Sequence, residues 1–184
     1  MVDLEHELER KVHRQQQQHC YQVKNDKVVF KQGVSKVHKT LKAAFIPWLL
    51  SSQLRNLLSV PFMLLLIIPF LLVDFSLSIY QHLCFRLYQI PRIKRGKYFV
   101  FDRHLLMYLN LFQKLNCCYC SYINGVIGFA REVAARNEQY WCPIKHAHKL
   151  SHPHRLYMNF SDYGDGVNFH QESQKLRQSL KIES

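Results

Sequence analysis

The chain has 184 residues, 48% of them hydrophobic, and its 25 Lys and Arg against 13 Asp and Glu give a formal net charge of +12. The length allows one domain with attachments. The basic residues crowd on both sides of an apolar run and accompany no nucleic-acid-binding motif, so we rank membrane phospholipid above nucleic acid as the partner. The six glycines are scattered and form no phosphate-binding loop of a kinase or nucleotide-binding protein.

Residues 1–43 are predicted to form a polar, basic and partly disordered N-terminal tail. Residues 3–18 are charged, end in four glutamines and have few apolar positions, which is typical of a solvated helix or a disordered segment. This segment lacks the apolar core of a cleavable signal peptide. A short hairpin around residues 32–33 is compatible with the valines that follow. The lysines of residues 24–42 belong either to a lipid-binding surface or to a solvated linker.

Residues 44–90 are predicted to be inserted in a membrane. Residues 57–73 form a continuous apolar run of 17 residues that contains Pro61 and Pro69 and ends at Asp74. Seventeen residues is close to the lower limit for a spanning helix, which needs about 20. Before this run, Trp48 has the ring type that is common at the headgroup level, so entry into the bilayer is expected over residues 43–55.

Basic residues flank the apolar run on both sides. The upstream group is Lys36, Lys39, Lys42 and Arg55, and the downstream group is Arg86, Arg92, Lys94, Arg95, Lys97 and Arg103. The positive-inside rule keeps both flanks in the cytoplasm, whereas a single span would place one of them outside. We therefore favour a re-entrant or two-helix hairpin that turns over residues 69–74, with a single span as the alternative. Asp74 near the bend would accept from free backbone donors or interact with His82.

Residues 91–160 are predicted to form a small α-helical domain on the cytoplasmic side. Asp102 is a suitable N-cap for a helix that begins at Arg103, because apolar residues recur with helical spacing after it. Asn116 is a candidate cap for a second helix, which should end over residues 140–142 because Pro143 disfavours a helical conformation before it. Residues 161–184 are predicted to be a polar C-terminal helix or tail, helical from Val167 to about Leu180, with Asp165 as its cap.

Four side chains in the second of these helices and just after it have types and spacing that suit one metal ion. They are Cys117, Cys120, Cys142 and His146, with Cys118 and His148 as substitutes. The spacing C-x2-C-x21-C-x3-H fits a zinc site or an iron–sulfur cluster. A straight helix of about 20 residues is about 30 Å long, so a closed site requires the helix to begin near Ile123 or to break at Gly125–Gly128.

The same cysteines have two other interpretations. Free cysteine is often a small apolar packing residue, and Cys142 beside His146 is a candidate nucleophilic or redox pair. Three cysteines within four residues are poorly placed for a disulfide framework, which indicates a reducing compartment. Gly125 and Gly128 would leave a smooth helix surface on which another membrane protein could dock.

The block FDRHLLMYLN…KLNCCYCSYINGVIGFAREVAARNEQYWCPIKHA, with the preceding SQLRNLLSVPF, resembles an uncharacterised family of membrane-associated proteobacterial proteins. The resemblance covers roughly residues 50–165 and implies a bacterial, membrane-associated protein. Together with the positive-inside rule, it leads us to expect a bacterial inner-membrane location with the N- and C-terminal parts cytoplasmic. It implies no activity and gives no residue a role. The combined expectation is a mainly α membrane-associated protein with a Cys/His metal site in a binding, assembly or redox-related role. A membrane-surface enzyme and a non-catalytic docking protein remain as alternatives.

Overall fold

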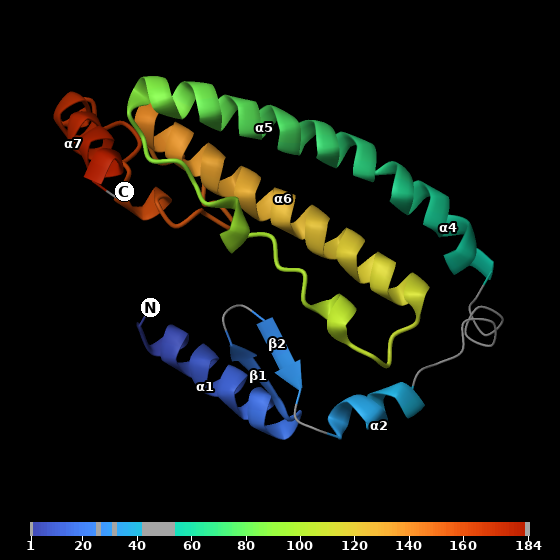
Figure 1. Ribbon diagram of the computed structural model, residues 1–184. Helices are drawn as coiled ribbons and strands as arrows, with labels where there is room; N and C mark the ends of the chain where they lie inside the picture. The colour runs from blue at the N-terminus through green and yellow to red at the C-terminus, as the bar shows by residue number, and fades with distance from the viewer. Residues whose placement is uncertain (1, 25–26, 31–32, 42–53, 183–184) are drawn as a thin grey trace. The chain divides into compact units, whose positions relative to one another are not determined.

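The computed structural model describes residues 2–24, 27–30, 33–41 and 54–182, and these are mainly helical, as predicted (Figure 1). Most of the expected bilayer entry at residues 43–55 lies outside them. The chain divides into two compact units. The first comprises Met1–Val60 with Phe101–Cys120, and the second comprises Pro61–Val100 with Ser121–Ser184.

The first unit begins with a helix, a hairpin and a second helix. Helix α1 is Val2–Gln18, strands β1 (Tyr21–Lys24) and β2 (Lys27–Phe30) pair antiparallel, and α2 is Val34–Thr40. Most described side chains of α1 are exposed, which agrees with a solvated helix. The hairpin expected around residues 32–33 lies earlier in the chain. Gly33 instead precedes α2 with φ of 96°, a conformation that glycine adopts without steric cost.

Helix α6, Leu111–Trp141, is one unbroken helix of 31 residues, and its start differs from the prediction. Asp102 precedes only a short 3-10 helix, Arg103–Leu105, and Asn116 lies inside α6. The N-cap is Asn110, whose Oδ1 accepts from the Gln113 backbone N–H at 2.8 Å, while Gln113 Oε1 accepts from the Asn110 N–H at 2.9 Å. This reciprocal capping box satisfies two helix-end donors. The predicted end, just before Pro143, is confirmed.

The apolar region forms α4, Leu54–Leu65, and α5, Ile67–Tyr88, with only Leu66 between them. The hairpin turn predicted over residues 69–74 is wrong, because α5 continues through these positions. Pro69 is the third residue of α5, where a missing N–H removes no intrahelical hydrogen bond. A proline ring clashes with the carbonyl four residues earlier, which is that of Leu65. The interruption therefore falls at Leu66 rather than after the proline.

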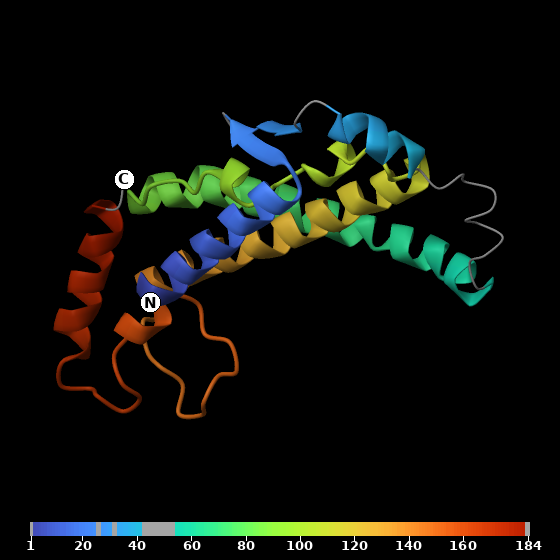
Figure 2. The ribbon, with the colours of Figure 1, turned by 90° about the horizontal axis from the view of Figure 1, so that it is seen from below.

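In the second unit, α5 and the second half of α6 lie side by side and run in the same direction (Figure 1, Figure 2). Asp74 meets Tyr122 near one end of the pair, and Tyr88 stacks on Tyr140 at 4.5 Å near the other. Residues 89–100, which we call the return segment, run back along this pair. The return begins at Gln89, which has φ of 58° and ends α5, with the Ile90 N–H donating to the Phe85 carbonyl.

Two hydrophobic clusters hold the second unit together. The larger joins α5, the return segment, α6 and the last helix, α7 (Phe169–Ile182). Its buried members are Phe85, Ile90, Ile93, Phe129, Val133 and Leu180. The smaller joins Ala135 of α6 to the 142–168 segment through Leu156, Tyr157 and Phe160. Helix α7 begins two residues later than predicted, and Asp165 Oδ1 accepts from the Asn168 N–H at 3.3 Å just before it.

The glycine surface of α6 is covered by the protein's own return segment. A Cβ at Gly125 would lie 2.8 Å from Phe99 Cδ1 and 3.1 Å from the Tyr98 carbonyl oxygen. A Cβ at Gly128 would lie 3.2 Å from Tyr98 Cδ1. In the described structure, Tyr98 and Phe99 of the protein itself therefore occupy the helix surface on which a partner was expected to dock. Small residues here allow the return segment to approach the helix backbone closely.

The two glycines should respond differently to alanine. We expect Gly125→Ala to lower the free energy of unfolding by about 1–3 kcal/mol, because the added methyl overpacks against a ring and a carbonyl. Gly128→Ala is the matched control and should be near neutral, because a gain in helix propensity of about 1 kcal/mol offsets a milder contact. Denaturant unfolding in mild detergent measures both. Equal effects would contradict the assigned packing.

Candidate functional site

The four predicted metal ligands do not converge. Cys117 and Cys120 lie in the first third of α6, whereas Cys142 follows its end and His146 lies in the loop beyond. The helix rises about 1.5 Å per residue, so the 22 positions from Cys120 to Cys142 correspond to about 33 Å. Helix α6 neither begins late nor breaks at Gly125–Gly128, which were the two ways to close the site. Within the described residues, no three His, Cys, Asp or Glu side chains gather as metal ligands.

The substitutes do not change this result. Cys118 lies beside Cys117 in α6, and His148 is an exposed residue of the loop that contains His146. The backbone N–H of His146 donates to the Tyr157 hydroxyl at 2.7 Å, and its ring stacks on the Tyr157 ring. These contacts give His146 a part in shaping the loop. A zinc or iron–sulfur site stays a prediction that this geometry does not favour.

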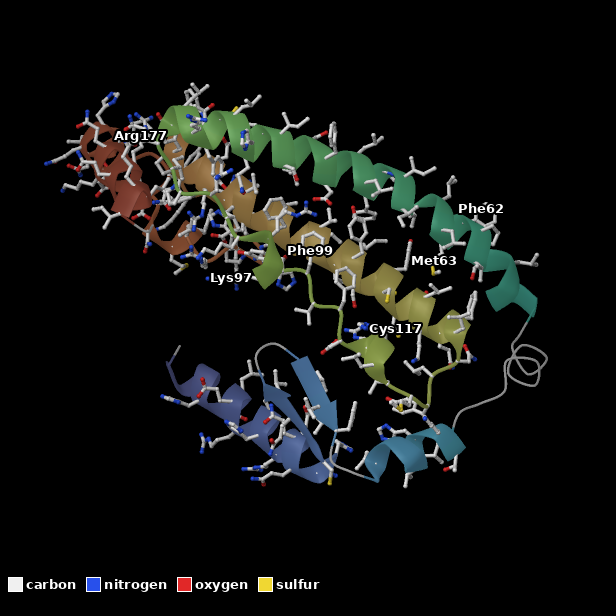
Figure 3. The ribbon with its side chains drawn as sticks, viewed as in Figure 1. Phe62, Met63, Lys97, Phe99, Cys117 and Arg177 are labelled. Carbon is white, nitrogen blue, oxygen red and sulfur yellow. The ribbon has the colours of Figure 1, made fainter. Side chains whose placement is uncertain are left out.

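Helix α5 buries two polar residues beside one core phenylalanine and exposes most of its large apolar side chains. Its buried residues are Asp74, Gln81 and Phe85. Large apolar side chains are exposed along α4, α5 and the residue between them: Leu58, Phe62, Leu64, Leu65, Leu66, Ile68, Leu71, Leu72, Val73, Phe75, Ile79, Leu83 and Leu87. Figure 3 shows Phe62 on the outer side of α4. A helix on the surface of a water-soluble protein has the opposite arrangement, with its apolar stripe facing the core.

In the part of the chain that the structure describes, one helix is long and apolar enough to cross a membrane. This helix is Leu58–Tyr88, which combines the end of α4 with α5, and only 6% of its most apolar window is buried. The core helix of a soluble protein would pass the same test of length and composition but would be mostly buried. The exposure of this helix is therefore more informative about its surroundings than its length and composition are.

Asp74 is the polar centre of the buried side of α5. Its Oδ2 accepts from Arg95 Nη2 at 2.7 Å and from the Tyr122 hydroxyl at 3.0 Å. The Asp74 side chain is 11% exposed and that of Arg95 is 46% exposed. The Arg95 guanidinium also lies over the rings of Phe99, at 4.7 Å, and Phe129, at 5.8 Å. One interaction thus joins α5, the return segment and α6.

Other polar contacts extend this junction along α5. Gln81 Nε2 donates to the Ile93 carbonyl at 3.1 Å, and the Tyr80 hydroxyl donates to Asn137 Oδ1. Each of these side chains therefore has at least one hydrogen-bond partner in the return segment or α6, although Asp74 Oδ1 and Gln81 Oε1 are buried without one. The expected interaction of Asp74 with His82 does not form. His82 instead receives a hydrogen bond from Arg92 Nη1 at 3.2 Å.

A second charged cluster holds the loop after α6. Glu132 Oε1 accepts from Arg136 Nε at 3.1 Å, an i,i+4 pair within α6, and from Arg155 Nη2 at 3.0 Å. Burial alone would raise the pKa of Glu132, but the hydrogen bonds from Arg155 and Arg136 lower it below its usual value. His154 Nε2 lies 3.0 Å from Glu138 Oε2. Both contacts join the loop to the last turns of α6.

Burial raises the pKa of the Tyr122 hydroxyl above its usual value, and the hydrogen bond that it donates to Asp74 raises the pKa further. A tyrosine hydroxyl is already protonated at physiological pH, so Tyr122 is a donor to the carboxylate there. Sequence reasoning missed both partners of Asp74, because Arg95 is one of several basic residues in its segment and no local pattern distinguishes it.

Comparison with protein-family models, with curated proteins and with solved structures found no match. The resemblance to proteobacterial membrane-associated proteins therefore stays a prediction. The functional argument rests on the geometry of α5 and the residues around it.

The Asp74–Arg95 pair should contribute measurably to stability. We expect a double-mutant cycle with Asp74→Asn and Arg95→Gln to give a coupling energy of about 1–2 kcal/mol, below that of a fully buried pair because Arg95 is half-exposed. The matched control is the Lys145–Asp162 pair, which has the same 2.7 Å distance but an Asp162 side chain that is 80% exposed. Its coupling should be below about 0.5 kcal/mol.

Denaturant unfolding of the single and double variants measures both cycles. Equal coupling in the two pairs would show that the Asp74 contact is no more than a surface ion pair.

Proposed function

We propose that the protein is a membrane-surface binding protein that enters the bilayer from one side through α4 and α5. The observation that carries this proposal is the exposure of most large apolar side chains of α4 and α5, while α5 buries Asp74 and Gln81 together with Phe85. Monomeric soluble proteins rarely expose a contiguous apolar patch of this extent. Acyl chains are the surroundings in which such a surface is stable, because they impose no hydrophobic penalty.

The neighbours of α5 limit how deeply it can enter. Its C-terminal half is covered on one side by elements that carry Arg95, Glu132 and Arg136. Charged groups are costly in the hydrocarbon core, so lipid tails cannot surround that half completely. The part before Asp74, residues 58–73, is about 24 Å long at 1.5 Å per residue. This length is short of the hydrocarbon thickness of about 30 Å.

Partial insertion accommodates these limits and the charge distribution. Residues 58–73 would lie among the acyl chains, while the second half of α5 lies at the headgroup level with the α6–α7 body on its aqueous side. Both basic flanks then remain on one side of the membrane, as the positive-inside rule requires. The side is the cytoplasmic face of a bacterial inner membrane. This arrangement needs no turn over residues 69–74.

The proposed role is binding of an anionic ligand at the membrane surface. The return segment that follows α5 has a high density of cations, including the exposed side chains of Arg92, Lys94 and Lys97. Such a segment is attracted to anionic headgroups by about 1 kcal/mol for each basic residue. The membrane therefore acts both as the anchor of the protein and as the source of its ligand.

Two arginines on the exposed apolar surface should abolish membrane retention. In the double variant Leu65→Arg/Leu72→Arg, each arginine would raise the free energy of membrane insertion by about 2.5–3.5 kcal/mol in a fully inserted helix. Both leucines are largely exposed in this structure (Leu72 63%), so the substitutions should leave the packing of the protein intact. The control is Val167→Arg/Ile182→Arg, at apolar side chains that are at least as exposed (Val167 93%) but lie outside α4 and α5.

Carbonate-washed membranes measure the distribution of each variant. The wild type and the control should remain in the pellet, whereas the Leu65→Arg/Leu72→Arg variant should move to the supernatant with its helical circular dichroism retained. A wild type that is soluble without detergent, or a leucine variant that stays in the pellet, would refute the proposed insertion.

A further inference from the structure

The exposed side of α5 changes from apolar to basic toward its C-terminal end. Phe75, Ile79 and Leu83 recur every four residues and so lie on one face of the helix. His82 and Arg86 continue this side by one turn, and both are exposed. The change lies within the half of α5 that the proposed insertion places at the headgroup level.

Two adjoining cavities follow this change. The first is lined by Phe75, Ser78, Ile79, His82 and Leu83. The second is lined by His82, Arg86, Ile90, Pro91 and Arg92. His82 lines both, so the two cavities meet at this side chain. We refer to the adjoining pair as the groove, with an apolar end at Phe75 and a basic end at Arg92.

The basic end of the groove is arranged to receive an anion. Arg92 Nη1 donates to His82 Nδ1, so a neutral His82 ring carries its proton on Nε2. Arg86 and Arg92 are exposed, and neither cavity has an acidic side chain among its described lining residues. The nearby carboxylate on this helix, Asp74, is buried against Arg95 and Tyr122.

We propose that this groove binds one anionic phospholipid. Arg86 and Arg92 hold the phosphate through charge-assisted hydrogen bonds, for which guanidinium groups have the matching geometry. His82 adds a donor through Nε2. One acyl chain follows Phe75, Ile79 and Leu83 toward the inserted part of the helix. This assignment rests on the membrane insertion proposed above and adds a defined ligand to it.

The groove is long enough for more than a phosphate. Phe75 and Arg86 are eleven positions apart, which corresponds to about 16 Å along the helix. A phosphate at Arg86 would therefore leave room for an acyl chain over the apolar part of the groove. A free phosphate would leave that part unused.

Native mass spectrometry of the full chain in detergent tests the assignment, with phosphatidylglycerol as the probe and phosphatidylcholine as the zwitterionic reference. The wild type should retain phosphatidylglycerol at least about tenfold more than phosphatidylcholine, one lipid per chain. Arg86→Gln/Arg92→Gln should lose this preference. The matched control is Lys149→Gln/Lys175→Gln, which removes the same charge from exposed positions outside the two cavities and outside the return segment, and should retain it.

Two further measurements separate the possible causes of a failure. Carbonate-washed membranes should retain the Arg86→Gln/Arg92→Gln variant. If this variant loses its lipid preference but stays in the membrane, the defect lies in the groove. If it is released from the membrane, the proposed insertion itself has failed. Ile79→Trp, which fills the apolar end, should reduce phosphatidylglycerol binding. Equal loss in the arginine and lysine variants would overturn the site in favour of diffuse charge attraction. Full displacement by inorganic phosphate at equal concentration would overturn it in favour of a simple anion site.

Discussion

The contact of Asp74 with Arg95 determines which side of α5 faces the rest of the second unit. A carboxylate inside an apolar helix must find a partner, and Arg95 and Tyr122 provide it from the return segment and from α6. With Asp74 directed inward, most of the large apolar side chains of α5 are exposed, although Phe85 is buried in the core. The Arg95 guanidinium also lies over the Phe99 ring, which packs against Gly125. The exposed apolar surface thus lies opposite one buried polar interaction.

Local rules predicted the parts of the fold that depend on neighbouring residues. They identified the apolar region, the end of α6 before Pro143 and the C-terminal helix. They misplaced the break in the apolar region because a proline disturbs the turn before it, at Leu66, rather than the residues after it. They placed caps at Asp102 and Asn116, whereas α6 is capped by Asn110, which has a glutamine three residues later that completes a capping box.

The candidate site depended on contacts that no local pattern contains. The cysteine spacing suggested a metal ion only if α6 broke at its glycines, yet Phe99 and Tyr98 pack against these glycines and the helix continues. The partners of Asp74 are 21 and 48 residues away in the sequence. Both errors have one origin, which is the return of residues 89–100 along the two helices. Hydrophobic periodicity describes a helix and its faces, whereas it does not reveal which irregular segment covers a face.

The most direct test of the account is the membrane sidedness of the two ends of the chain. In a cysteine-free background that still pellets with membranes, Leu8→Cys and Val167→Cys place single thiols at exposed positions on either side of the apolar region. A membrane-impermeant maleimide is applied to spheroplasts before and after permeabilisation. Entry from one side predicts that both thiols react only after permeabilisation. Reaction of one thiol in intact spheroplasts, with the other protected until permeabilisation, would contradict the account and establish a single span.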